Sequence, residues 1–414
     1  MKVALVNTSD SSGGAARAAC RLLQGLRSNG LSATMFVQEN LGGDVGINGH
    51  AVGGKQGVHV ARFSLDKLPL RMLYPSISPS FSLAWLPGNL PRRVKRFGTD
   101  VVHLHWVNSG FLSIDALKSL HVPIVWTLHD MWAFSGGCLY TGDCEKYKER
   151  CGKCPQLESK SDRDISRWVW TRKEKAWRDL PLTIVTPSYW LAECAQKSPL
   201  LSRFRIEVIP NGLNLEVYKP QDKITVRQHL GLPVDKKLIL FGAMQATSDR
   251  RKGFYLLREV LEIIRQNGWG DHCEAVVFGS SEETIDAHGL KTHSLGVLND
   301  EQSIVDAYSA ADVFVAPSVQ ENLANTVMEA LACGTPCVAF DIGGMPDMID
   351  NGSNGYLATP FDANSFATGI IRLIENDKFL KKASARARDK VINTFELTMI
   401  AQKYQSLYEE VVNK

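Results

Sequence analysis

The 414-residue sequence predicts an α/β protein with two doubly wound parallel-sheet domains. Short β-branched runs alternate with longer helical patterns, as in parallel sheets covered by helices. The pattern pauses near residues 210–212 and restarts at 237–241, as if a second domain began there. The length also suits two to three domains of about 150 residues. Ligands of open parallel sheets bind beyond the carboxyl ends of the strands, so we expect a ligand in a cleft between the domains.

The first domain is expected to span residues 1–210. Its first strand is predicted at 3–6, followed by a turn at 11–14 and a helix over 15–28. The later strands are expected at 32–37, 100–105, 123–128, 182–185 and 205–209. Residues 395–414 contain a strongly amphipathic helix, which we expect to pack back on this domain.

The second domain is expected to span residues 211–394. Strands are predicted at 237–241, 275–278, 313–316 and 336–339. Helices are expected to start near Lys252, Asp300, Thr326 and Ser365. The same alternation of strand and helix therefore predicts a second doubly wound unit.

Composition excludes several classes of protein. With 44% hydrophobic and 22% charged residues, the chain is expected to be globular rather than disordered. A net charge of +3 is too small for a dedicated nucleic-acid binder, so nucleic acid is not an expected partner. We find no signal-peptide core and no apolar run of about 18 residues, and we expect a cytoplasmic protein.

The loop at 11–14, Ser-Ser-Gly-Gly, separates the first strand from the first helix. Glycines there allow close backbone approach, and the free N–H groups of a helix N-terminus can bind phosphate. The third glycine of the dinucleotide fingerprint and the Gly-Lys-Ser/Thr of a P-loop are both missing. A tight strand-to-helix turn is the alternative interpretation.

A stronger constellation follows the strand predicted at 313–316. Glu321 comes just before a helix and Glu329 lies inside it, while the backbone N–H groups from Leu323 onward are available to a diphosphate. Thr326 and Glu329 also have the spacing of a capping box, in which the glutamate only satisfies the helix N-terminus. Glu321 has no such local duty.

Residues 321–329, with Gly-Thr-Pro at 334–336 and Gly-Gly at 343–344, resemble the nucleotide-sugar motif of the retaining glycosyltransferases of family 4. Further matches occur in the expected order at 13–14, 129–130, 187–188, 210–212 and 252–253. The resemblance spans nearly the whole chain and implies the GT-B fold, with two Rossmann-like domains that face a cleft. Within the family, the chain looks most like bacterial transferases for exopolysaccharide or O-antigen synthesis.

The resemblance also implies roles for individual residues. Those implied for binding the donor are Gly13, Gly14, Leu323, Ala324, Asn325 and Glu329, the last through the ribose. Those implied for catalysis are Glu321, His129, Lys252 and Arg251. Glu321 would contact the transferred sugar, His129 would line the cleft beside that sugar, and Lys252 would neutralise the leaving diphosphate.

One departure concerns the positive charge at the diphosphate. Many family members carry an Arg shortly after the glycine that ends the first strand of the second domain, but Gly242 is followed here by Ala-Met-Gln. Arg250 or Arg251 must then supply this charge, and we assign it to Arg251. The only Asp-x-Asp, at 162–164, is interpreted as a solvated helix start, and no cofactor is expected for catalysis.

Two further features are open to two interpretations. His103 and His105 share a strand face and with His129 suggest a metal site, but satisfied or cleft-lining histidines are favoured. Residues 63–96 combine a Leu, Phe, Pro and Trp-rich stretch with a basic run at 92–96. This segment either docks a lipid-linked acceptor at the inner face of the cytoplasmic membrane or is an insertion packed on the first sheet.

Four cysteines fall close together after the strand at 123–128: Cys138, Cys144, Cys151 and Cys154. Their loop has little apolar material, and only the last pair has the two-residue spacing typical of a shared metal. We expect one structural Zn²⁺ with these four ligands, away from the chemistry. Unlinked thiols are the alternative.

Together these features predict an enzyme that transfers a sugar from a UDP- or GDP-sugar to a growing glycan, with retention and without a metal. The expected acceptor is a lipid-linked polysaccharide intermediate, with peripheral membrane contact. A nucleotide-sugar epimerase or hydrolase of the same fold would turn over the donor without an acceptor. A non-catalytic binding protein would hold the donor and never release nucleotide.

Overall fold

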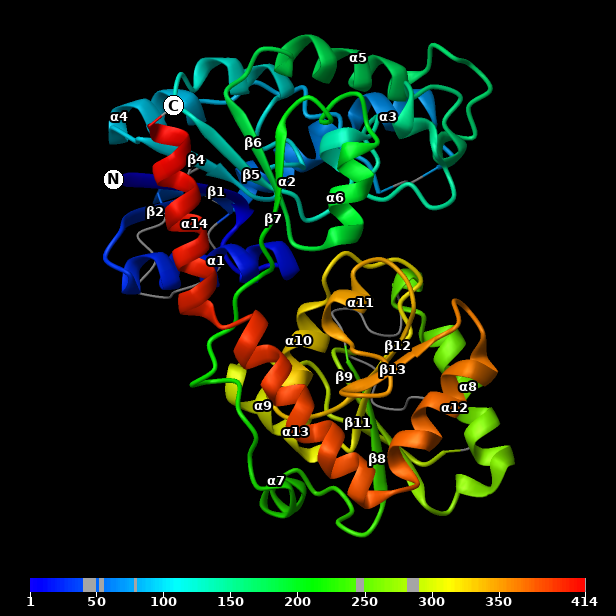
Figure 1. Cartoon of the computed structure of the whole chain (residues 1–414). Coiled ribbons are helices and arrows are strands. Elements are labelled where there is room, and N and C mark those ends of the chain that lie inside the picture. Colours follow the sequence, from blue (N-terminus) through cyan, green and yellow to red (C-terminus); the bar gives the residue numbers. More distant parts are fainter. Residues whose placement is uncertain (40–49, 52–55, 78–79, 243–248, 281–289, 414) are drawn as a thin grey trace. The chain divides into compact units, whose positions relative to one another are not determined.

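The computed structural model of the chain describes residues 1–39, 50–51, 56–77, 80–242, 249–280 and 290–413. These residues form two compact units, Met1–Gly212 with Thr398–Lys414, and Leu213–Leu397. Each unit contains one parallel sheet with helices on both faces (Figure 1). The predicted α/β class with two doubly wound sheets is therefore confirmed.

The first unit contains a seven-stranded sheet in the order β3-β2-β1-β4-β5-β6-β7. Its strands are β1 Lys2–Ser9, β2 Ser32–Glu39, β3 His50–Ala51, β4 Val101–Leu104, β5 Ile124–Thr127, β6 Leu182–Thr186 and β7 Arg205–Val208. Its helices are α1 Gly14–Ser28, α2 Gln56–Asp66, α3 Leu68–Leu73, α4 Leu90–Phe97, α5 Ile165–Trp177, α6 Tyr189–Gln196 and α14 Leu397–Val412.

Alternate residues of β1 point to opposite faces of this sheet. Val3 and Leu5 pack with α1 and α14, which lie side by side in Figure 1. Ala4 and Val6 belong to the core on the other face, where α4, α5 and α6 pack. Residues 3–6 of β1 are all apolar because helices cover both faces of the sheet.

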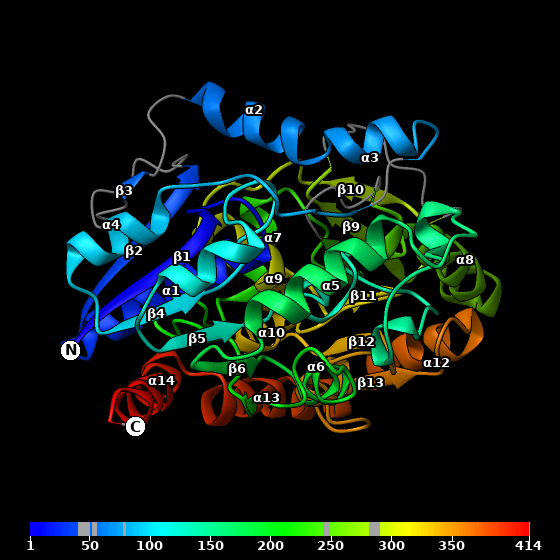
Figure 2. The same ribbon diagram turned by 90° about the horizontal axis from the view of Figure 1, so that it is seen from above.

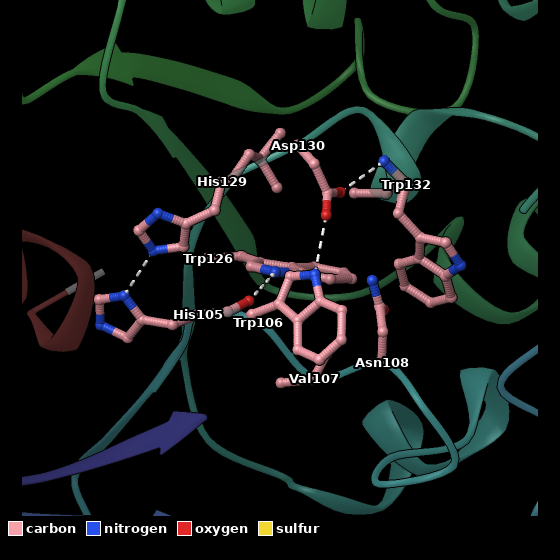
Figure 3. Close-up of a pocket in the computed structure, with 10 residues that line it drawn as sticks. His105, Trp106, Val107, Asn108, Trp126, His129, Asp130 and Trp132 are labelled. Carbon is pink, nitrogen blue, oxygen red and sulfur yellow. Dashed lines mark hydrogen bonds between the residues drawn. The ribbon is translucent and has the colours of Figure 1, made fainter. Parts of the chain in front are cut away.

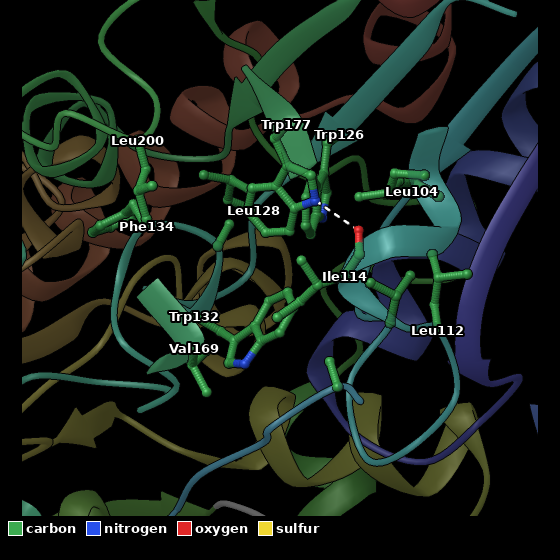
Figure 4. Close-up of a cluster of buried hydrophobic side chains, with 14 of the residues drawn as sticks. Leu104, Leu112, Ile114, Trp126, Leu128, Trp132, Phe134, Val169, Trp177 and Leu200 are labelled. Atoms are coloured by element: carbon green, nitrogen blue, oxygen red, sulfur yellow. Dashed lines mark hydrogen bonds between the residues drawn. The ribbon is translucent and has the colours of Figure 1, made fainter. Parts of the chain in front are cut away.

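The core on the face of this sheet that α4, α5 and α6 cover is rich in tryptophan (Figure 4). The rings of Trp126, Trp132 and Trp177 lie within 5.2–6.1 Å of one another, and the Trp177 indole donates to the carbonyl oxygen of Ile114 at 3.0 Å. Lys173 is fully buried among them, with its ammonium 3.6 Å from the Trp132 ring centroid. Burial lowers the pKa of Lys173 to about 7.

The second unit contains a six-stranded sheet in the order β10-β9-β8-β11-β12-β13. Its strands are β8 Lys237–Gly242, β9 Cys273–Phe278, β10 Thr292–Ser294, β11 Val313–Ala316, β12 Cys337–Phe340 and β13 Gly355–Ala358. Its helices are α7 Lys223–His229, α8 Phe254–Ile264, α9 Glu301–Ala310, α10 Asn325–Ala332, α11 Met345–Met348, α12 Ala363–Ile374 and α13 Asp377–Thr394.

Both sheets have a point at which the strand order reverses. It lies between β1 and β4 in the first unit and between β8 and β11 in the second. The loops that leave these strands at their carboxyl ends flank the usual ligand position of an open α/β sheet. The residues expected to act in binding and catalysis lie on these loops, on neighbouring ones or in the first turns of the helices that follow.

Some local predictions are corrected by the structure. The helix expected near Lys252 begins at Phe254, after a 3₁₀ turn over Arg250–Lys252. The predicted helix start at Asp164 is confirmed, since its carboxylate accepts a hydrogen bond from the Arg167 N–H. This side chain is buried rather than solvated.

Candidate functional site

The turn before α8 packs tightly against the loop after β11. Gly253 has φ +73°, and a Cβ at this position would lie 1.9 Å from the carbonyl oxygen of Pro317. Only glycine permits both that backbone conformation and that approach. The Val319 N–H also donates to the Arg251 carbonyl oxygen at 2.9 Å. Backbone packing therefore holds the 3₁₀ turn next to the loop that carries Glu321.

The loop after β12 closes on Glu321 from a second direction. Gly343 has φ +54°, and a Cβ there would lie 1.9 Å from the Glu321 carbonyl oxygen. The Gly344 N–H donates to the same oxygen at 3.3 Å. Gly343, the first glycine of the pair in the family motif, thus has a local physical reason, which is to let one backbone lie against another.

Lys252 and Glu321 form an ion pair within this group of loops. The Lys252 ammonium donates to Glu321 Oε2 at 2.6 Å, and the two side chains are 28% and 14% exposed. Partial burial strengthens such a pair relative to one in open water. The structure thus brings two of the four expected catalytic residues into direct contact.

Arg251 points its guanidinium at Asp249. Its Nη2 lies 2.8 Å from Asp249 Oδ2 and its Nε lies 3.2 Å from Oδ1, a two-point contact with one carboxylate. The neighbouring Arg250 lies over the Tyr255 ring, 4.9 Å from its centroid. Residues 243–248, where the family arginine is missing, lie outside the described residues.

Three expected phosphate-binding residues lie at the start of α10. Leu323 and Ala324 are buried, and Asn325 is the first residue of the helix. Ala324 is the N-cap and makes no side-chain capping bond. Thr326 lies inside the helix, so the capping box considered for Thr326 and Glu329 is wrong. The spacing of Thr326 and Glu329 suggested a side-chain cap for the N–H groups at this helix terminus, and the N-cap residue provides none.

Glu329 is fully buried and lies one turn into α10. Its Oε2 accepts a hydrogen bond from the hydroxyl of Tyr308, also fully buried, at 3.1 Å. Burial, together with this carboxylate, raises the pKa of Tyr308 well above its ordinary value. A ribose contact at Glu329 therefore requires side chains to move. Sequence reasoning missed Tyr308, which carries no motif and meets Glu329 only through packing of α9 and α10.

In the first unit, Gly13 and Gly14 stand where β1 leads into α1. Gly13 is the N-cap of α1 and has φ +91°. A Cβ at this position would meet nothing within 4 Å, so the turn requires glycine for its backbone conformation and not for lack of space. Both the turn interpretation and the ligand-loop interpretation fit this geometry.

His103, His105 and His129 form a histidine cluster at the carboxyl ends of β4 and β5, in which the first two side chains are buried and His129 is half-buried. Both ring nitrogens of His103 are hydrogen-bonded, Nδ1 to the Tyr408 hydroxyl at 2.6 Å and Nε2 to Thr127 Oγ1 at 2.7 Å. Burial lowers the pKa of His103 to about 3 and that of His129 to about 4. Burial, and then the other two histidines, also holds the pKa of His105 well below 6.5. All three imidazoles are neutral at pH 7.

His105 and His129 also line a small pocket with several indoles (Figure 3). The Trp106 indole donates to Asp130 Oδ2, and the Trp132 N–H donates to Asp130 Oδ1, both at 2.8 Å. The enclosed part has room for about one water molecule. The pocket therefore suits a single hydroxyl-sized group.

The structure gives no support for the expected zinc site at the four clustered cysteines. Among the residues that the structure describes, no group of three or more His, Cys, Asp or Glu side chains could hold a metal ion. Cys138, Cys151 and Cys154 are buried thiols outside any disulfide, and Cys144 is half-buried. Burial raises the pKa of Cys138 to about 12 and that of Cys151 to about 11. The expectation of a structural Zn²⁺ at these four cysteines therefore finds no support in the part of the chain that the structure describes.

The two sheets, with their candidate residues at the switch points, define a GT-B protein. A solved structure of sucrose-phosphate synthase from Thermosynechococcus elongatus matches with a TM-score of 0.70 and 20% identity, covering 99% of both chains. The Anabaena protein Alr3699/HepE, in complex with UDP and glucose, matches with a TM-score of 0.67 and 17% identity over 99% of this chain and 100% of its own. These similarities establish the fold.

Two family models match the chain. The model Glycosyltransferase Family 4 matches residues 12–217, and the model Glycosyl transferases group 1 matches residues 235–376. The chain belongs to glycosyltransferase family 4. A D-inositol 3-phosphate glycosyltransferase from Nocardioides sp. is 26% identical over 352 residues, covering 78% of this chain and 72% of the relative. No helix in the described part of the chain is long and apolar enough to cross a membrane.

Proposed function

We propose that this chain transfers a sugar from a UDP- or GDP-sugar to a hydroxyl group of a growing glycan, with retention of anomeric configuration. The ion pair between Lys252 and Glu321 carries the proposal. It lies beside the switch point of the second sheet, next to a helix start whose N-cap residue, Ala324, makes no side-chain capping bond. The complexes of the Anabaena neighbour with UDP and glucose support a nucleotide-sugar donor.

Loss of the nucleoside diphosphate develops negative charge on the β-phosphate. The Lys252 ammonium and the N–H groups at Leu323–Asn325 are donors held in place before the reaction starts. Such preorganised donors each contribute about 3–4 kcal/mol in enzymes that stabilise an oxyanion. Arg251 adds charge once it leaves Asp249. This set supplies the stabilisation that a metal gives in other transferases, so the reaction is proposed to be metal-independent.

The remaining residues act on the sugar and the nucleoside in this proposal. Glu321 accepts hydrogen bonds from the transferred sugar after Lys252 turns to phosphate. Glu329 receives the ribose when Tyr308 moves aside. Gly13 and Gly14 approach the diphosphate from the first unit, and His129 lies beside the transferred sugar.

We also propose a lipid-linked polysaccharide intermediate as acceptor, reached by peripheral docking at the membrane. Helices α2 and α3, at the top of Figure 2, carry exposed apolar side chains. These are Val60, Leu65, Leu68, Met72 and Leu73. Arg71 is exposed beside them, and α4 adds exposed Arg92, Lys95 and Arg96. Apolar and basic groups together favour an anionic membrane surface.

A phosphorylated polyol is a second candidate acceptor. It is favoured by the relatives described as D-inositol 3-phosphate glycosyltransferases, which are 26–29% identical to this chain. The two acceptors differ in charge, so a panel that contains both separates them. If α2 and α3 act only in packing, reversing the charge of this surface should leave transfer to lipid-linked acceptors unchanged.

The test combines binding with turnover. Calorimetry with UDP, GDP and ADP identifies the nucleotide, and transfer is then followed with and without a chelator. Proton NMR of the product reports its anomeric configuration. Donor consumption without acceptor would favour the epimerase or hydrolase, and binding without nucleotide release would favour the binding protein. Inversion, or loss of activity that only a metal restores, would overturn the corresponding part of the proposal.

A further inference from the structure

His105 is the immediate neighbour of the imidazole expected to meet the sugar. Its Nδ1 lies 3.0 Å from Nε2 of His129, and the two rings are stacked with their centroids 5.3 Å apart (Figure 3). The His105 side chain is buried, and its carbonyl oxygen accepts a hydrogen bond from the Trp126 indole at 3.0 Å. Backbone and ring are therefore both held in place against His129.

Each imidazole in this pair carries one proton at neutral pH. Burial disfavours the charged form of both rings, and the other members of the histidine cluster add to this effect for His105. A contact between two neutral imidazoles has one donor nitrogen and one acceptor nitrogen. The direction of this one hydrogen bond therefore sets the tautomer of both residues.

The far side of the His105 ring decides the direction. Its Nε2 is buried and has no hydrogen-bond partner in the described structure. If His129 donated, His105 would carry its proton on this Nε2, and a buried N–H would be left without an acceptor. Buried N–H groups without a partner are rarer in proteins than acceptors with an unused lone pair. The proton on His105 is therefore favoured at Nδ1.

We propose that His105 is a positioning residue that donates its Nδ1–H to Nε2 of His129 and so holds His129 as the Nδ1–H tautomer. His129 then carries its proton on Nδ1, which is a donor of the kind that a sugar oxygen accepts from, and does not act as a base through that atom. The part of this proposal that concerns the sugar rests on the proposed function. The tautomer itself does not.

Nitrogen-15 NMR of the full chain without ligand tests the tautomer directly. We expect the proton of His129 on Nδ1 and that of His105 also on Nδ1. A proton on Nε2 of His129 would overturn the proposal. The measurement needs no substrate, so it stands or fails separately from the glycosyltransferase assignment.

Three variants test the positioning role. His105→Asn places an amide donor near the position of Nδ1, whereas His105→Phe keeps a ring and removes the donor. We expect His105→Phe to lower kcat at least tenfold with KM for the donor changed less than threefold, and His105→Asn to restore most of kcat. His103→Phe is the matched control, because His103 bonds Tyr408 and Thr127 and not His129.

The control variant should lose stability but keep the His129 tautomer of the parent. Equal losses of kcat in His105→Phe and His105→Asn, with the tautomer of His129 unchanged in both, would reduce His105 to a packing residue. If His105→Phe fails to fold, the NMR result on the parent chain and the turnover of His105→Asn still decide the matter.

Discussion

Replacing Glu321 with glutamine should strengthen nucleoside diphosphate binding while it lowers turnover. The Glu321 carboxylate accepts a hydrogen bond from the Lys252 ammonium at 2.6 Å, so an incoming diphosphate competes with an internal anion. Measured exposed ion pairs contribute about 0.2–1 kcal/mol, and partial burial places this pair near the upper value. A gain of about 1 kcal/mol corresponds to roughly fivefold tighter binding. Turnover should fall about a hundredfold because the negative charge beside the reacting sugar is lost, although the amide oxygen of glutamine can still accept a hydrogen bond.

A double-mutant cycle isolates the effect. Calorimetry with UDP and GDP should show tighter binding for Glu321→Gln in the parent chain and little change when Lys252 is already Ala. Lys252→Ala alone should weaken binding and depress turnover together, because it faces phosphate in both the ground state and the transition state. Unchanged or weaker binding in Glu321→Gln would refute the competition, and so would the same gain in the Lys252→Ala background.

Three further predictions follow from the geometry. Gly343→Ala should lower turnover strongly, because the new Cβ would collide with the backbone of Glu321. Gly352→Ala is the control: Gly352 has a similar positive φ of +72°, but no atom lies within 4 Å of a Cβ there, so this variant should cost only about 1–2 kcal/mol of stability. Activity and urea unfolding of both variants separate the effect of backbone strain from that of collision. The three histidines of the cluster have lowered pKa values, so the unfolded state takes up protons first as the pH falls. Their contribution to stability should be present above the unfolded pKa of about 6.5 and should decrease toward pH 5, by about 2 kcal/mol for each of His103 and His129. A urea midpoint that stays constant over this range would contradict the prediction. Met72→Asp with Leu73→Asp should reduce sedimentation with anionic vesicles but not thermal stability, because both side chains are exposed, and unchanged sedimentation would count against membrane docking.

Most strands could be predicted because buried parallel strands leave a clear apolar signal. Three were missed, and each lacks that signal. β10 is a polar edge strand, Thr-His-Ser, and β13 is Gly-Tyr-Leu-Ala without a β-branched residue. β3 has only two residues, His50–Ala51. A short edge strand forms because it pairs with the neighbouring strand, and the pattern of residues within the segment does not indicate that pairing.

The candidate site, too, could be predicted only in part from the sequence. Glu321 and Lys252 could be predicted from the motif, yet their contact joins residues 69 positions apart and follows only from the fold. The expected zinc site finds no support among the described residues, and cysteine spacing alone does not reveal how the side chains are arranged or that three of the four thiols are buried. Tyr308 belongs to neither motif, and its bond to Glu329 exists because α9 and α10 pack together.

The way the loops pack limits what donor binding has to change. Gly253 lies against Pro317 and Gly343 lies against Glu321, so the backbone that carries the ion pair is already fixed from two sides. A diphosphate that binds Lys252 therefore has to break one side-chain contact, that between Lys252 and Glu321. The backbone of the loops is already in place. Because preorganised groups lose little entropy on binding, most of the electrostatic attraction to phosphate remains available for stabilising the leaving group. On this reasoning, a variant that loosens the glycine contacts should lose turnover even though it keeps every charged residue of the site.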